Sequence, residues 1–87
     1  MRSRDSYEKA IADCSRTGDW SFREEFIAAA GDAIWRAGSP AEAWRTLWRY
    51  HRRCKTPMER AIVLREGERI HMWETMPHPK PSPGNEA

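Results

Sequence analysis

Two cysteines and three histidines are the side chains of this 87-residue chain best suited to metal or thiol chemistry. His51 and Cys54 are three residues apart, which places both on one face of a helix, and Cys14 and His71 could complete four zinc ligands. The chain has no Cys-x-x-Cys pair and no second close pair of ligands. We therefore expect buried thiols and an interfacial histidine, and no metal.

Catalysis is not indicated by these groups either. Cys54 and His51 fall on the apolar side of their predicted helix, where burial raises the pKa of a thiol. A disulfide between Cys14 and Cys54 is geometrically possible, but disulfides are rare in reducing compartments. Glu24 and Glu25 are adjacent on an outer face with no cleft indicated, and the glycines form no phosphate-binding loop. The sequence predicts a protein that is not an enzyme, with no catalytic residues and no cofactor.

Basic residues are concentrated in the middle of the chain. The formal net charge is only +2, but residues 36–60 hold seven basic side chains against two acidic ones. Four of these charges, Arg45, Arg49, Arg52 and Arg53, share one arc of a predicted helix and repel each other. Folding alone gives no reason to gather them there, whereas binding to an anionic partner does. The alternative is that the arginine stems solvate a helix face and cover tryptophan rings. The predicted partner-binding residues are Arg45, Arg49, Arg52, Arg53, Lys55, Trp35 and Arg36.

Trp35 belongs to this set because it lies off the apolar stripe of its helix. Tryptophan is enriched at the hot spots of protein interfaces, so an exposed Trp35 would be an aromatic anchor. The competing interpretation is that Trp35 packs against the first helix or the C-terminal tail.

Two classes of partner fit this basic surface. The sequence favours a small binding protein that engages an acidic protein surface, a class that includes adaptors and phage- or plasmid-encoded inhibitors, and it leaves a homodimer open. The alternative is a nucleic-acid-binding regulator, because the Ala37-Gly38-Ser39-Pro40 turn resembles that of a helix-turn-helix. In that case helix 39–54 would enter the major groove, although Ile34 stands where that motif usually has a small residue.

Capping boxes mark the starts of three helices. In each box a Ser or Thr hydroxyl accepts from a first-turn N–H, and a Glu three residues later reaches back to the cap. Proline directly follows two of the caps, where its missing N–H costs nothing. The three boxes are Ser21–Glu24, Ser39–Glu42 and Thr56–Glu59.

Apolar spacing of three and four residues predicts an all-α fold, a compact bundle of four helices. The expected helices are residues 6–16, 21–37, 39–54 and 56–75, and the last one contains Gly67, where a stop followed by an extended segment is the alternative. Trp44 and Trp48, one turn apart and opposite the arginines, are expected in the core.

The chain is expected to be one helical domain, residues 1–76, followed by a disordered Pro-rich tail, residues 77–87. The N-terminus has no apolar stretch behind its charges, and the longest apolar run is too short to span a bilayer. We therefore expect a cytoplasmic protein with no membrane partner.

Overall fold

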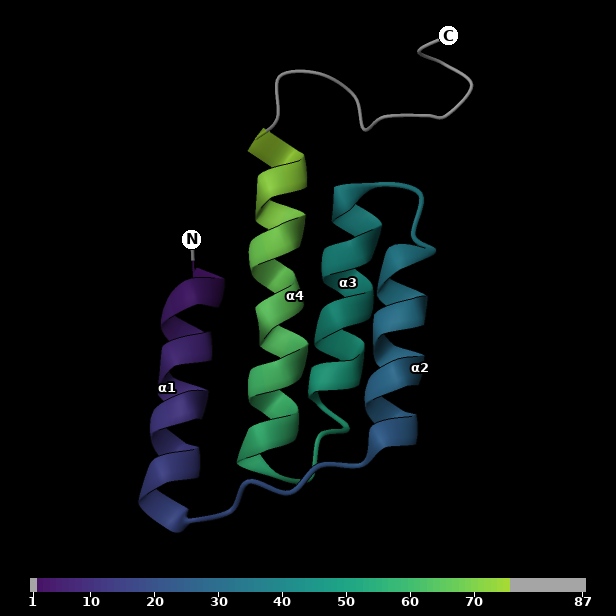
Figure 1. Ribbon diagram of the computed structural model, residues 1–87. Coiled ribbons are helices and arrows are strands. Elements are labelled where there is room, and N and C mark those ends of the chain that lie inside the picture. The colour runs from purple at the N-terminus through teal and green to yellow at the C-terminus, as the bar shows by residue number, and fades with distance from the viewer. Residues whose placement is uncertain (1, 76–87) are drawn as a thin grey trace, which may run out of the picture.

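The computed structural model describes residues 2–75, which form four helices and no strand in that range (Figure 1). They are α1 (Arg2–Thr17), α2 (Glu24–Trp35), α3 (Pro40–His51) and α4 (Pro57–Thr75). The predicted all-α bundle of four helices is confirmed. The Pro-rich tail predicted for residues 77–87 lies outside the described residues.

Two of the three predicted capping boxes start helices. The Ser39 hydroxyl accepts from the Glu42 N–H at 3.2 Å, and the Glu42 carboxylate accepts from the Gly38 N–H at 3.1 Å. At the start of α4 the Thr56 hydroxyl accepts from the Glu59 N–H at 3.1 Å. Because each cap satisfies a backbone donor in the first turn, α3 and α4 begin directly after their cap residues.

The box predicted at Ser21 is wrong, and α2 begins three residues later, at Glu24. The Ser21 hydroxyl donates to the Asp19 carboxylate at 2.7 Å instead of capping the helix. The cap residue is Arg23, which makes no side-chain cap, and its own N–H donates to the Glu59 carboxylate at 2.9 Å. A carboxylate from a distant part of the chain thus takes the place of the local cap.

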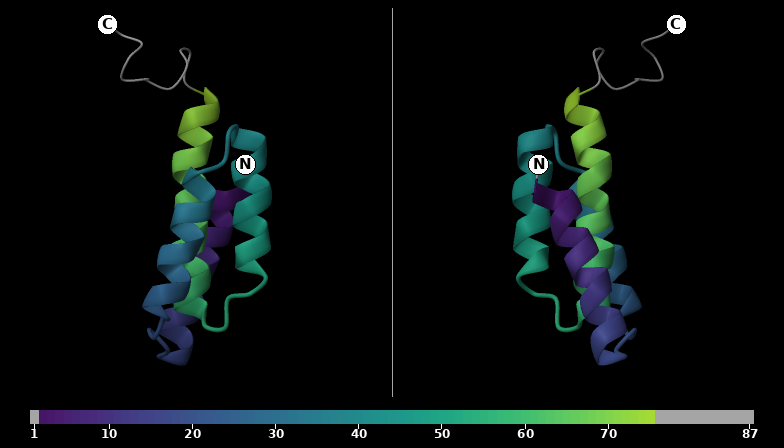
Figure 2. Two further views of the ribbon diagram at one scale, coloured as in Figure 1. Left: turned by 90° about the vertical axis from the view of Figure 1, so that its right-hand side faces the viewer. Right: turned by 90° about the vertical axis from the view of Figure 1, so that its left-hand side faces the viewer.

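Helix α4 lies at the centre of the bundle and packs against each of the other three helices. Helices α2 and α3 form an antiparallel pair that closes over one side of α4, while α1 lies on another side (Figures 1 and 2). Among the described helices, α1 packs against α4 alone. The side chains that meet in the core are Ala10, Ala30, Ile34, Ala43, Leu47, Ala61, Val63, Leu64 and Ile70.

The predicted core position of Trp48 is wrong, and that of Trp44 is only partly right. Ala43 and Leu47 are the fully buried residues of α3, and Trp44 packs against the core from the side. Trp48 is 36% exposed. It lies on the flank of α3 that faces towards α1, and α1 does not reach α3 to cover it.

Helix α4 runs without interruption through Gly67, so the alternative of a stop and an extended segment is excluded. Gly67 is buried inside the bundle. Glycine in a helix interior costs roughly 1 kcal/mol relative to alanine, and burial of the surrounding face of α4 offsets that cost. None of the helices within residues 2–75 has the length and apolar character needed to cross a membrane.

Candidate functional site

The basic residues predicted as a binding surface lie around the outer face of α3 and the turn that follows it. Helix α3 ends at His51, three residues earlier than expected, so Arg52, Arg53 and Lys55 belong to the turn. All five of these side chains are exposed, and none makes a hydrogen bond or ion pair with another residue in the described range. We call this set the α3 basic surface: Arg45, Arg49, Arg52, Arg53 and Lys55.

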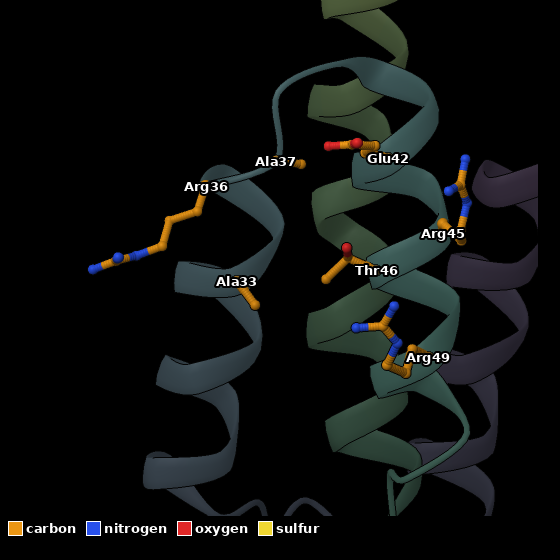
Figure 3. A pocket seen from close by; sticks show the side chains of 7 residues that line it. All are labelled: Ala33, Arg36, Ala37, Glu42, Arg45, Thr46 and Arg49. Atoms are coloured by element: carbon orange, nitrogen blue, oxygen red, sulfur yellow. The ribbon is translucent and has the colours of Figure 1, made fainter.

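Arg36 is the predicted site residue that does not join this set. Its guanidinium is held by Asp32 of the same helix at 2.9 Å, and in Figure 3 it points away from α3. Both partners are exposed, so the pair itself contributes little to stability. It does direct the charge of Arg36 away from the α3 basic surface.

A shallow hollow of about 270 Å³ separates α2 from α3 beside these arginines (Figure 3). Arg36, Arg45 and Arg49 all contribute to its lining. In Figure 3 the Arg49 guanidinium points towards α2, whereas those of Arg36 and Arg45 point away from the hollow in opposite directions. Glu42 also lines the hollow. Because the cations diverge and a carboxylate lies among them, the arrangement suits a broad anionic surface better than a small anion held in a pocket.

Trp35 lies at the junction of α2 and α4. Its indole N–H donates to the Glu66 carboxylate at 2.8 Å, its ring centroid is 6.2 Å from that of Trp73, and the Arg69 guanidinium lies 5.0 Å above its ring. The ring is 38% exposed. Trp35 therefore packs on α4, where its indole N–H and its ring are already engaged, and the tail named in the competing interpretation lies outside the described residues.

The exposed aromatic residue next to the arginines is Trp48, which the sequence interpretation placed in the core. Its ring stacks on Trp44 with centroids 6.3 Å apart and meets the His51 ring edge-on at 5.3 Å. Burial and the nearby Arg60 lower the pKa of His51, so this ring is neutral at pH 7. The signal that could have found this was the helical angle of Trp48, between Trp44 and the outward arginines.

A second feature that the sequence did not reveal is an ion pair between the exposed Arg23 and the buried Glu59. The Glu59 carboxylate is fully buried and accepts from Arg23 Nε at 2.7 Å, Arg23 Nη2 at 2.8 Å and the Lys55 N–H at 2.7 Å. The Arg23 hydrogen bond is the main reason that the pKa of Glu59 is lowered to about 2. Arg23 Nη2 also donates to the Arg53 carbonyl at 3.1 Å, which ties the turn bearing three of the basic residues to the bundle.

The two thiols are poorly suited to chemistry. Cys14 and Cys54 are both free, and the Cys14 sulfur lies 4.0 Å from the sulfur of Met58. Burial raises the pKa of both thiols, to about 11 for Cys54, so they stay protonated near neutral pH. Within residues 2–75 no group of three His, Cys, Asp or Glu side chains is placed to hold a metal ion.

Helices α2 and α3 lie side by side and antiparallel in each view (Figures 1 and 2). In a helix-turn-helix the two helices instead meet at about 90–120°, so that the second projects into the major groove. The resemblance seen in the turn at residues 37–40 does not extend to the packing of the helices. Comparison with protein-family models, curated proteins and solved structures found no significant match to this chain.

Proposed function

We propose that this chain is a small binding protein that recognises an acidic protein surface through the α3 basic surface. The observation that carries the proposal is that five exposed basic side chains gather there with no intramolecular ion pair among the described residues. Their mutual repulsion is unfavourable in the isolated chain, and carboxylates of a partner would relieve it. Guanidinium groups suit this role because each can bind a carboxylate through two parallel hydrogen bonds.

Trp48 supports a protein partner. It is an exposed tryptophan on the same helix as Arg45 and Arg49. Tryptophan and arginine together dominate the hot spots of protein interfaces, since one contributes buried apolar area and the other directional charged hydrogen bonds. We therefore assign to Trp48 the anchoring role that the sequence suggested for Trp35.

The unpaired arginines also favour a second candidate function, the binding of nucleic acid through phosphates. The antiparallel packing of α2 and α3 argues against insertion of α3 into the major groove as in a helix-turn-helix. Contacts to the phosphate backbone alone would not require that geometry. The two candidates therefore differ in the chemical nature of the molecule that contacts α3.

Site-specific photo-crosslinking in the source organism tests the proposal. A benzophenone amino acid replaces Arg52 in one variant and Glu25, an exposed residue of α2, in the control. We expect position 52 to yield an adduct whose mass shift survives nuclease and is lost to protease, and position 25 to yield none. A nuclease-sensitive adduct at position 52 would support the second candidate instead. Adducts of equal yield from both positions would contradict both.

A further inference from the structure

An open groove lies between α1 and α3, on the side of α3 opposite the hollow in Figure 3. Both helices pack on α4, but they do not pack on each other. The right-hand view of Figure 2 shows α1 in front, with α3 and α4 to either side of it. A hollow of about 290 Å³ marks the groove, lined by Lys9 and Asp13 of α1, His51 of α3, and Arg60 and Leu64 of α4.

His51 lines the hollow from α3, and aromatic rings continue from it along α3. Trp44, Trp48 and His51 follow one another along the same flank of α3, with rings in contact. In a closed bundle a neighbouring helix would cover such a row, whereas here Trp48 remains 36% exposed. Packed helices lie about 8–10 Å apart, so a further helix laid along this flank of α3, beside α1, would bury these rings.

The charges around the groove identify the kind of occupant. Lys9 and Arg60 line it, and the outward arginines of α3 stand next to its aromatic wall. The acidic lining residue Asp13 is already paired with Arg16 at 2.7 Å. A second copy of this chain would bring like charges together, whereas an acidic segment would neutralise them.

We propose that the α1–α3 groove binds an amphipathic helix of the partner, with its apolar face on Trp44, Trp48 and His51 and its acidic residues on Lys9, Arg60 and Arg52. This inference rests on the proposed function and specifies the structure of the partner's binding segment. Recognition of a helix by an apolar groove depends on anchor residues spaced by three, four and seven positions. Carboxylates on the flanks of that helix would reach the basic residues on both sides.

A displayed library of peptides of about 18 residues, five helical turns, is the direct test. One helical face is varied among Leu, Ile, Phe, Trp and Met, and the other positions among Asp, Glu, Lys, Arg, Gln and Ala. We expect selection on the intact chain to enrich peptides with acidic flanks, and the amide signals of Lys9, His51 and Leu64 to shift most when a selected peptide binds. Enrichment of basic peptides, no enrichment, or shifts confined to other surfaces would overturn the proposal.

Two substitutions separate this inference from the proposed function. Trp48→Ala and Lys9→Glu should each weaken a selected peptide at least about tenfold, the loss expected of an interface anchor, while Trp20→Ala, an exposed tryptophan in the loop between α1 and α2, should not. Circular dichroism verifies the fold of each variant, and Lys9→Glu changes no buried residue. Retained peptide binding in both groove variants, together with loss in Arg49→Glu/Arg53→Glu, would refute the groove and leave the proposed function standing. A dimer that the peptide dissociates would show that a second copy fills the groove and would also refute it.

Discussion

Glu59 is the residue on which three parts of the bundle converge. Its buried carboxylate accepts hydrogen bonds from Arg23 and from the Lys55 N–H, and so joins the start of α2 and the α3–α4 turn to α4. A glutamine at this position keeps one oxygen and replaces the other with an NH2 donor, so two of the four donors that now bind the carboxylate would lose their acceptor. A buried donor left without an acceptor costs about 1–3 kcal/mol.

Glu59→Gln should therefore lower the free energy of unfolding by about 2–3 kcal/mol, measured by urea denaturation at pH 7. The matched control, Glu25→Gln on the exposed face of α2, should change it by less than about 0.5 kcal/mol. The effect should depend on pH. Because the pKa of Glu59 is lowered from 4.5 to about 2, its stabilisation is present above pH 4.5 and is lost as the pH falls through about 2. The gap between wild type and variant should narrow over that range, and a gap that is constant with pH would contradict this role.

Leu47 and Trp48 are neighbours in sequence that differ in burial. Leu47 is fully buried, so Leu47→Ala should cost about 2–5 kcal/mol. Trp48 is about one-third exposed, so Trp48→Ala should cost about 1–2 kcal/mol, less than a core tryptophan. Urea midpoints of the two variants give the comparison. A larger loss for Trp48→Ala than for Leu47→Ala would mean that α3 is rotated relative to this structure.

The spacing of residues along α3 predicted that its arginines are exposed. It did not predict that Trp48 is exposed or that Trp35 packs on α4. An arginine row opposite apolar residues of the same helix is a local property, and Arg45, Arg49 and Arg52 are all exposed. The exposure of Trp48 depends on α1 stopping short of α3, and the engagement of Trp35 depends on Glu66 of α4. The packing between helices that determines both facts cannot be predicted from residue spacing along a single helix.

At the level of the helices, the capping boxes correctly predicted the starts of α3 and α4 but not the start of α2. Ser39 and Thr56 cap their helices because nothing else competes for the first-turn donors. At Ser21 the competing groups are Asp19, which takes the serine hydroxyl, and Glu59, which takes the Arg23 N–H. Asp19 is two residues from Ser21, whereas Glu59 is 36 residues from Arg23, so only the first competitor was visible locally.

The two serines therefore respond differently to the same substitution. Ser39→Ala removes a helix cap and should cost about 0.5–2 kcal/mol. Ser21→Ala removes an exposed hydrogen bond to Asp19 and should stay within about 0.5 kcal/mol. Thermal or urea unfolding measures both. Equal losses for the two variants would show that Ser21 caps α2 after all.

In the molecule as a whole, α4 packs against the other three helices, and α3 carries exposed basic residues on its outer face. The helix count followed from periodicity, but the central position of α4 and the open groove beside α1 are set by long-range packing. As a result α3 has a basic outer face, a hollow on its α2 side and an aromatic wall on its α1 side. Both proposals place the partner on this helix.

Charge reversal on α3 tests the central claim most directly. The variant Arg49→Glu/Arg53→Glu is compared with Arg16→Glu/Arg65→Glu, which changes the net charge equally but lies on α1 and α4. Binding to the partner identified by crosslinking is measured by isothermal titration calorimetry, and circular dichroism verifies the fold of both variants. We expect reversal at positions 49 and 53 to abolish binding, while the charge-matched control binds within about threefold of the wild type. Intact binding after reversal at positions 49 and 53, or equal loss in both variants, would contradict it.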